Sequence, residues 1–341
     1  MSNGEIKHTK QPANAFDDDP SLRPATLAEF VGQEQLKRNM WTYIEAARKG
    51  KRTLDHVLLS GPPGLGKTTM AVIIAHELNV GFYQHAAPTL EKPGDLVSIL
   101  LNLQPHDVLF IDEIHRLRPN IEEFLYPAME DMRIDIVLDS GVGARSVNYR
   151  IAPFTLIGAT TRVGMLTGPM RTRFGIVERI DFYPPEELKT IVIRSSKILR
   201  VKIDENGVYE IAKRSRGTPR LVNRYLRRLR DFAQVHGNGC ITNDSAVYGF
   251  KELDIDESGL TRLDRAYLNV IIEHHRGGPV GIDTIAATLS EDSGTLEDEI
   301  EPYLLRLGFI NRTPRGRTAT EKAFRFFGKL INSSESQEKL F

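Results

Sequence analysis

The feature that most constrains this chain is a short apolar run that leads into a glycine-rich loop and then into a helical pattern. The run is HVLLS, residues 56–60, and GPPGLGKTT follows it at residues 61–69. A Gly-x4-Gly-Lys-Thr spacing between a strand and a helix predicts a phosphate-binding loop. Glycines let backbone N–H groups turn towards phosphate oxygens, and the helix N-terminus adds partial positive charge. The alternative is a glycine-rich turn that binds nothing.

Individual residues of this loop have expected roles. Gly64 and Gly66 allow the backbone to turn around the phosphates, and Lys67 is expected to reach the β- and γ-phosphates. Thr68 is expected to direct its hydroxyl to Mg²⁺. ATP and Mg²⁺ are therefore the cofactors that the loop predicts.

The residues around the loop predict an α/β fold. From residue 55 to residue 181, the short apolar runs HVLLSG, GFYQHA, DVLFID, TLIGAT and ERIDF alternate with helical patterns at 67–78, 93–103 and 121–129. Strands that alternate with helices predict a parallel sheet covered on both faces. Residues 133–151 interrupt this order with two alternating runs around a glycine-containing turn, which predicts a β-hairpin that projects from the sheet domain.

The second half of the chain has a different character. A helical pattern begins after Pro185 and continues to about residue 253, and the acidic stretch DIDESG follows it at 254–259. Helices are then expected at 260–275, 282–288 and 294–307, before two short strands around a Pro/Gly turn, which is the pattern of a winged helix. The predicted parts are a flexible arm 1–20, a large ATPase-type domain 21–182, a small helical lid domain 183–255, a winged helix 256–330 and a flexible tail 331–341.

Composition limits the partners and the compartment. The 45 basic and 45 acidic residues give no net charge, so any contact with nucleic acid must come from local clusters. Cys240 is the single cysteine, which excludes a disulfide within the chain and favours a cytoplasmic location. No apolar run approaches the ~18 residues of a membrane span, so no membrane contact is expected.

An acidic pair at the end of an apolar strand predicts hydrolysis. In VLFIDEIH, residues 108–115, Asp112 suits Mg²⁺ and Glu113 suits a water molecule that attacks the γ-phosphate. A kinase needs no water-activating acid here, because its nucleophile is a substrate hydroxyl. The alternative is a solvated acidic pair. His115 is expected to be structural.

Two further segments carry candidate catalytic side chains. TLIGATT ends in Thr160 and Thr161, whose hydroxyls can orient the attacking water or sense the γ-phosphate; simple capping of the strand end is the alternative. GPMRTRFG, residues 168–175, carries Arg171 and Arg173, and a guanidinium can neutralise charge on the transferring phosphoryl group. The spacing does not say whether such an arginine acts in its own subunit or in a neighbour.

Two basic segments are candidates for anion contacts. Residues 213–230 hold eight basic residues, of which Arg220 stands at a helix start and could reach back to the phosphates. The other basic residues of that segment form a solvated face, a subunit contact or a nucleic-acid patch. Residues 306–329 hold seven basic residues and one acidic, and Arg315 and Arg317 are expected to point outward from the turn. Such a wing can follow phosphates without reading bases; a solvated charged turn is the alternative.

These elements, in this order, resemble the AAA+ ATPases and in more detail the RuvB family, the hexameric motors of bacterial Holliday-junction branch migration. The resemblance runs from about residue 21 to residue 327. It is carried by LRPATLAEFVGQ, GPPGLGKTT, LFIDEIHRL, MEDMRIDIVLDSGVGARSV, TLIGATTR, GPMRTRFGI, GTPRLVNR and EPYLLRLGFINRTPRGRTAT. The hairpin and the RTPRGR wing are the most specific of these.

The resemblance implies roles for individual residues. Leu22, Arg23 and Tyr183 would surround the adenine, and Lys67, Thr68 and Thr69 would hold phosphates and Mg²⁺. Thr160 and Thr161 would be the first sensor, and Arg220 the second. Arg173 would be an arginine finger donated to the neighbouring subunit, and Glu130, Asp131 and Met132 would contact nucleotide. Arg312, Arg315 and Arg317 would contact DNA.

The resemblance also implies partners. They are a homohexameric ring, duplex DNA at Holliday junctions, RuvA bound at the 133–151 hairpin, and RuvC in a resolving complex. The chain departs from the family at 290–295, where no basic residue stands, and at the hairpin tip LDSGVGA. An AAA+ machine that remodels or loads a protein partner is the alternative function, and a slow P-loop switch is a third.

Overall fold

The computed structural model describes residues 20–137 and 146–329, which form two compact units. The first unit comprises the described residues up to Leu199 together with Gly217–Arg224. The second comprises Arg200–Arg216 and the described residues from Tyr225 onward. The predicted N-terminal arm 1–20 falls outside the described residues except for residue 20. The hairpin tip and the tail also lie outside them.

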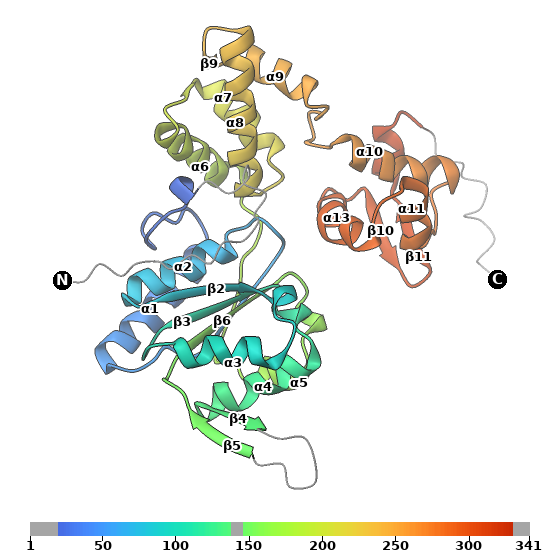
Figure 1. The fold of residues 1–341 in the computed structure, drawn as a ribbon. Coiled ribbons are helices and arrows are strands. Elements are labelled where there is room, and N and C mark those ends of the chain that lie inside the picture. The colour runs from blue at the N-terminus through green and yellow to red at the C-terminus, as the bar shows by residue number, and fades with distance from the viewer. Residues whose placement is uncertain (1–19, 138–145, 330–341) are drawn as a thin grey trace. The chain divides into compact units, whose positions relative to one another are not determined.

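A five-stranded parallel sheet is the centre of the first unit (Figure 1). Its strands lie in the order β2-β3-β6-β1-β7. Their bounds are β1 Val57–Ser60, β2 Phe82–Ala86, β3 Val108–Asp112, β6 Thr155–Thr160 and β7 Ile176–Arg179. The three central strands β3, β6 and β1 are almost entirely buried, which explains their continuous apolar sequence.

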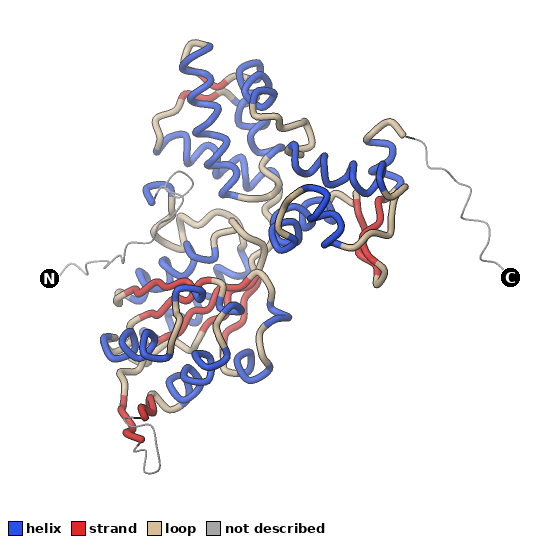
Figure 2. Tube along the Cα trace, turned by 45° about the vertical axis from the view of Figure 1, so that its right-hand side comes forward, coloured by secondary structure: helices blue, strands red, loops and turns tan. Residues whose placement is uncertain are grey.

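Helices cover both faces of this sheet (Figures 1 and 2). Helices α1 and α2 pack together on one side, and α3 and α4 pack together on the other. Leucines and isoleucines of α3 and α4 share one buried core with β3 and β6. The helices of this unit are α1 Glu34–Gly50, α2 Lys67–Leu78, α3 Pro93–Asn102, α4 Pro119–Glu130, α5 Gly168–Thr172 and α6 Pro185–Ile198.

The predicted α/β fold is confirmed. Helix α2 has the predicted bounds, and α3 and α4 differ from prediction by one or two residues at their ends. The last strand lies earlier than expected, at Ile176–Arg179 instead of the ERIDF run, because its partner β1 ends at Ser60, which pairs with Arg179. The predicted hairpin is present as antiparallel strands β4, Arg133–Val137, and β5, Ser146–Arg150.

The second unit begins with a small helical part. Helix α7, Glu205–Arg214, packs against α9, Asn243–Glu252. A two-residue parallel pairing joins β8, Lys202–Ile203, to β9, Cys240–Ile241. Helix α8, Pro219–His236, starts in the first unit and continues into this one. The helical pattern expected from Pro185 to about residue 253 is therefore present as the helices α6, α7, α8 and α9.

The remainder of the second unit is the predicted winged helix. Its elements are α10 Arg262–Asn269, the π-helical turn Val270–His274, α11 Ile282–Leu289, α12 Ser293–Thr295, a second π-helical turn Leu296–Ile300, α13 Glu301–Arg306, β10 Ile310–Thr313, β11 Gly316–Ala319 and α14 Glu321–Phe326. Strands β10 and β11 pair antiparallel and form the wing. Helix α14 was not predicted; Thr320 caps its N-terminus. In the described part of the chain, no helix is long and apolar enough to span a membrane.

Candidate nucleotide-binding site

Three neighbouring strands of the sheet bring the phosphate loop and the predicted catalytic residues Glu113, Thr160 and Thr161 to one edge. The phosphate loop follows β1, Asp112 ends β3 with Glu113 next to it, and Thr160 ends β6 with Thr161 next to it. The carboxyl ends of parallel strands are where open α/β sheets bind their ligands. Because β3, β6 and β1 are neighbours in the sheet, these motifs lie close together although they are far apart in the sequence.

The glycine-rich loop needs its glycines for steric reasons. Gly61 has φ 140°, and a Cβ there would lie 2.2 Å from the carbonyl oxygen of Ile180. Gly66 has φ 105° and forms the N-cap of α2. Both conformations are in the region that side chains avoid, so the loop conformation depends on glycine at these positions.

Lys67 is buried at the centre of the loop. Its Nζ donates hydrogen bonds to the carbonyl oxygens of Gly61, at 2.7 Å, and Pro62, at 3.0 Å. Burial lowers the pKa of the Lys67 ammonium, and the nearby Glu113 and Asp112 carboxylates oppose this shift. Phosphate oxygens would offer this cation stronger, charge-assisted hydrogen bonds than the carbonyl oxygens that now accept from it.

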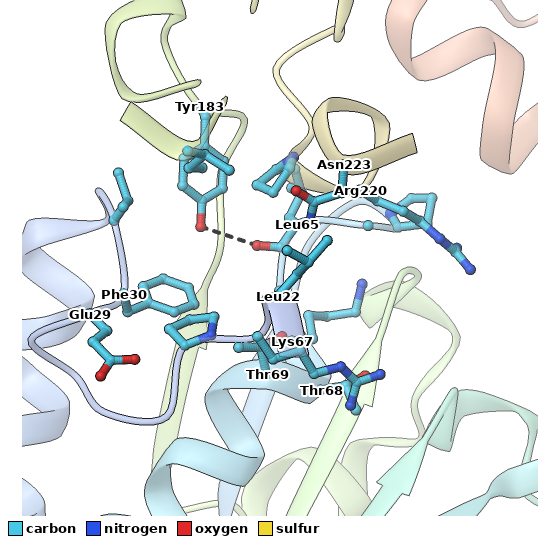
Figure 3. Close-up of a pocket in the computed structure, with 18 of the residues that line it drawn as sticks. Leu22, Glu29, Phe30, Leu65, Lys67, Thr68, Thr69, Tyr183, Arg220 and Asn223 are labelled. Carbon is cyan, nitrogen blue, oxygen red and sulfur yellow. Dashed lines mark hydrogen bonds between the residues drawn. The ribbon is translucent and has the colours of Figure 1, made fainter. Parts of the chain in front are cut away.

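A single pocket collects most of the predicted nucleotide contacts (Figure 3). Every predicted residue of the loop lines it, as do Asp112 and Glu113. The residues that were predicted and line this pocket are Leu22, Arg23, Gly64, Gly66, Lys67, Thr68, Thr69, Asp112, Glu113, Tyr183 and Arg220. Segments far apart in the sequence thus converge on one cavity of the first unit.

The N-terminal segment and the loop before α6 form the pocket wall opposite the phosphate loop. The Tyr183 hydroxyl donates to the carbonyl oxygen of Leu65 at 3.2 Å, as Figure 3 shows. The Tyr183 N–H donates to the carbonyl oxygen of Gly217 at 2.9 Å. Burial, with a contribution from the Glu187 charge, raises the pKa of the Tyr183 phenol. Tyr183 therefore stays a neutral donor that ties the wall to the loop.

The structure adds pocket residues that sequence reasoning did not identify. Phe30, Glu29, Arg194 and Asn223 line the cavity. Arg194 Nη1 donates to the carbonyl oxygen of Leu22 at 2.7 Å and so fixes the segment that was predicted to surround the adenine. Glu29 and Phe30 lie in LRPATLAEFVGQ and Asn223 lies in GTPRLVNR, but nothing in these motifs singles them out, and Arg194 belongs to no motif because it lies in the amphipathic helix α6. Only their three-dimensional placement reveals them.

Arg220 approaches the phosphate loop through its backbone. Its N–H donates to the carbonyl oxygen of Gly64 at 3.3 Å. A Cβ on Gly64 would lie 3.0 Å from the Arg220 Cβ, so the two segments are packed closely. The Arg220 charge also opposes the rise in the pKa of Asp112 that burial causes.

The acidic pair has two different environments. Burial and the neighbouring Glu113 charge raise the pKa of Asp112, while Lys67 opposes the shift. The Glu113 N–H donates to Asp112 Oδ1 at 3.0 Å. Glu113 itself has φ 51° and accepts a hydrogen bond on Oε2 from the Thr161 hydroxyl at 3.2 Å. His115 Nδ1 lies 3.0 Å from Thr160 Oγ1, so the histidine expected to be structural is part of this cluster.

The residues present fit a Mg²⁺ ion. Thr68 and Asp112 both line the pocket and provide a hydroxyl and a carboxylate, the hard oxygen donors that Mg²⁺ prefers. Within residues 20–137 and 146–329, no three His, Cys, Asp or Glu side chains are grouped to hold a metal. Mg²⁺ in nucleotide sites is commonly held by one or two protein ligands together with phosphate oxygens and waters.

Arg173 lies apart from this pocket. Its guanidinium carbon lies 4.2 Å from the centroid of the Tyr126 ring, and its Nη2 lies 3.1 Å from Glu130 Oε1. Its Nη1 donates to the carbonyl oxygen of Pro169 at 2.8 Å. Arg173 is not among the described residues that line the pocket of its own chain. The same holds for the predicted nucleotide contacts Glu130, Asp131 and Met132. Their predicted roles stay predictions.

The predicted DNA contacts of the winged helix differ in exposure. Arg312 has a side chain that is 48% exposed, whereas Arg317 is 14% exposed. Both donate to Glu301, which is completely buried, with Arg312 Nε to Oε2 at 2.6 Å and Arg317 Nε to Oε1 at 2.7 Å. The prediction that Arg317 points outward is wrong, because Glu301 and Glu297 hold it inward. Arg315 is exposed as expected.

The Glu301 carboxylate is stabilised by several donors. Burial alone would raise its pKa, but hydrogen bonds from Arg317, Tyr267 and Arg312 outweigh burial and hold the pKa below its usual range. The Tyr267 hydroxyl donates to Oε1 at 2.6 Å. The base of the wing is therefore a buried ion network that fixes both arginines.

Comparisons with known proteins cover nearly the whole chain. The model of the RuvB P-loop domain of Holliday junction DNA helicases matches residues 22–180, that of the RuvB AAA lid domain matches 183–256, and that of the RuvB C-terminal winged-helix domain matches 257–328. The structure of the Thermotoga maritima RuvB Holliday junction branch migration motor is 47% identical, with a TM-score of 0.84, and the match covers 91% of this chain and 99% of that one. A lysine-to-arginine variant of Thermotoga maritima RuvB matches with 47% identity, the same coverage and a TM-score of 0.85. The resemblance predicted from the motifs is confirmed.

Proposed function

The chain belongs to the RuvB family, and we propose that it is an ATP-driven translocase that moves duplex DNA and drives branch migration of Holliday junctions. The observation that carries this proposal is the single pocket in which the phosphate loop, the acidic pair, Tyr183 and Arg220 meet. The second support is the winged helix, whose wing carries the exposed Arg312 and Arg315.

ATP hydrolysis in this pocket uses the residues as follows. Lys67 exchanges its carbonyl partners for phosphate oxygens. Thr68 and Asp112 are the residues that would hold a Mg²⁺ ion, which would supply positive charge against the phosphates. Glu113 accepts the proton of the attacking water. Thr160 and Thr161 orient this water and the terminal phosphate. Leu22, Arg23 and Tyr183 hold the adenine end.

The site is completed by a neighbouring subunit. We assign Arg173 as the finger that enters the next subunit's pocket, where its charge stabilises the transferring phosphoryl group. The support is its location with Glu130 outside its own chain's pocket. Glu130, Asp131 and Met132 approach the neighbour's nucleotide from the same surface. A closed ring satisfies this head-to-tail arrangement, and six subunits are the number that the family implies.

The partners follow from the family in the same way. Duplex DNA is held by phosphate contacts from the wing, which suits a motor that must accept any sequence. RuvA binds at the 133–151 hairpin, and RuvC joins in the resolving complex. The location is the bacterial cytoplasm. The division into an ATPase domain 21–182, a lid 183–255 and a winged helix 256–330 is part of this proposal.

The proposal is tested by measuring ATP hydrolysis while duplex DNA is titrated at several salt concentrations. We expect DNA to stimulate hydrolysis and binding to weaken steeply with salt, because counterions are released from the phosphates. Hydrolysis with neither DNA stimulation nor salt-sensitive binding would favour the alternative machine that remodels a protein partner.

A further inference from the structure

A histidine lies between Glu113, which lines the pocket, and Thr160 at the end of the neighbouring strand β6. His115 Nδ1 is 3.0 Å from Thr160 Oγ1 and 3.2 Å from Glu113 Oε2. Its side chain is 5% exposed and belongs to the short 3-10 turn Ile114–Arg116, which directly follows Glu113. The turn at Glu113, with φ 51°, brings the imidazole back towards the carboxylate of its near neighbour in sequence.

The surroundings of Nδ1 decide where the imidazole proton lies. A carboxylate oxygen only accepts hydrogen bonds, so a lone pair on Nδ1 would face the negative charge of Glu113 Oε2 at 3.2 Å. A proton on Nδ1 replaces this repulsion with attraction and serves the Thr160 oxygen as well. We therefore assign the proton to Nδ1 on the basis of the hydrogen-bond network.

This assignment determines what the Thr160 hydroxyl can do. Thr160 Oγ1 accepts from the Arg162 N–H at 3.0 Å and from His115 Nδ1 at 3.0 Å. A hydroxyl oxygen has two acceptor lone pairs and one proton. With both lone pairs used, the hydroxyl has only its proton to offer, and a sensor of a phosphate or an attacking water needs a donor.

We propose that His115 is a positioning residue for ATP hydrolysis, whose Nδ1–H holds the Glu113 carboxylate and the Thr160 hydroxyl in one orientation. This inference rests on the proposed ATPase function. When Glu113 turns towards the attacking water, the Nδ1–H remains on Thr160 and keeps its hydroxyl proton directed to the substrate. The base and the sensor are thereby oriented by one side chain that does not itself line the pocket.

The test compares two amides that each mimic one ring nitrogen. The amide nitrogen of Asn is at about the distance of Nδ1 from the backbone, whereas that of Gln is at about the distance of Nε2. We expect His115→Asn to retain kcat within about threefold, and His115→Gln and His115→Ala to lose about 10- to 100-fold, the size of effect that a small misplacement causes. Affinity for a fluorescent ATP analogue should be unchanged in all three.

Two results separate this inference from the proposed function. If the unaltered protein hydrolyses no ATP, the proposed function is wrong. If it hydrolyses ATP but His115→Gln has the same kcat as His115→Asn, or His115→Ala has an unchanged kcat, the role proposed for His115 is wrong. A double-mutant cycle between His115→Gln and Thr160→Val provides a second test that requires no alanine variant. Loss factors that multiply would contradict the shared network, and a double variant no slower than the slower single variant would support it.

Discussion

The guanidinium of Arg173 stacks on the ring of Tyr126, with its carbon 4.2 Å from the ring centroid. Glu130 adds an ion pair at 3.1 Å, and the Arg173 Nε is buried without a hydrogen-bond partner among the described residues. A cation over an aromatic face is held in direction as well as in place. Arg173 therefore has a defined position outside its own pocket.

Replacing Arg173 with alanine should separate binding from hydrolysis. Nucleotide affinity should be nearly unchanged, because Arg173 does not line its own chain's pocket. The rate of ATP hydrolysis should fall by ~10³-fold or more, as expected for an arginine finger. Both quantities can be measured on the same preparation.

Mixing subunits tests whether Arg173 acts on a neighbour. Glu113→Gln subunits retain Arg173, and Arg173→Ala subunits retain Glu113, so mixed rings should contain some complete sites and regain activity. Mixtures that stay inactive at every ratio, while still forming rings, would contradict a shared site.

The Tyr126 ring should matter more than its hydroxyl. Tyr126→Phe keeps the aromatic face and should retain near-normal kcat, although it loses the hydrogen bond from the hydroxyl to Glu122. Tyr126→Leu removes the face and should lower kcat about 5- to 30-fold, which corresponds to about 1–2 kcal/mol of cation–π interaction. Equal kcat values for the two variants would show that the stacking does not position Arg173.

Replacing Asp112 should stabilise the fold and impair nucleotide binding with Mg²⁺. Burial and the Glu113 charge raise its pKa, so the ionised carboxylate destabilises the fold above that pKa and the penalty disappears as the pH falls through it. Asp112→Asn should therefore raise the melting temperature at pH 7. The same variant should lose the Mg²⁺ dependence of nucleotide binding.

A pH series provides the control for this prediction. The gain in melting temperature should shrink as the pH falls, since Asp112 becomes protonated in the unsubstituted protein. A gain that is the same at acidic and neutral pH would show that the carboxylate charge is not its cause.

Arg315 is exposed on the wing and Arg317 is held inward by Glu301, so the two should respond differently to substitution. Arg315→Ala should weaken duplex binding and reduce the slope of log affinity against log salt by about 1, the value for one lost phosphate contact. Arg317→Ala should in addition destabilise the protein by about 3 kcal/mol, because it leaves the buried Glu301 charge with fewer partners.

Removing both charges of the network tests the origin of that cost. Arg317→Met combined with Glu301→Gln should be more stable than Arg317→Ala alone, as measured by denaturant unfolding. If Arg317→Ala were as stable as the unsubstituted chain, the ion network would not support the wing.

The ordered motifs predicted the sheet and most of the pocket because each motif lies at the end of a buried strand. The loop at 61–69 and the pair Asp112 and Glu113 follow apolar runs whose burial is plain from the sequence. Parallel pairing then brings these ends together without further information. Arg194 could not be predicted, since its role depends on how α6 meets Leu22.

Side-chain direction was harder to predict than side-chain location. Arg317 is in the wing as expected, but the pairing partner that turns it inward, Glu301, is 16 residues away on α13. His115 was expected to be structural by default, although it lies close to the acidic pair in the sequence. Its contacts with Thr160 and Glu113 arise from the turn at Glu113 and from the β3-β6 pairing together.

Branch migration of a synthetic four-way junction tests the central claim most directly. With RuvA, ATP and Mg²⁺, the chain should convert the junction into two duplexes, and Glu113→Gln should bind the junction but leave it intact. The same junction without RuvA shows whether the motor needs help to load. Hydrolysis of ATP with no junction conversion under any of these conditions would contradict the account.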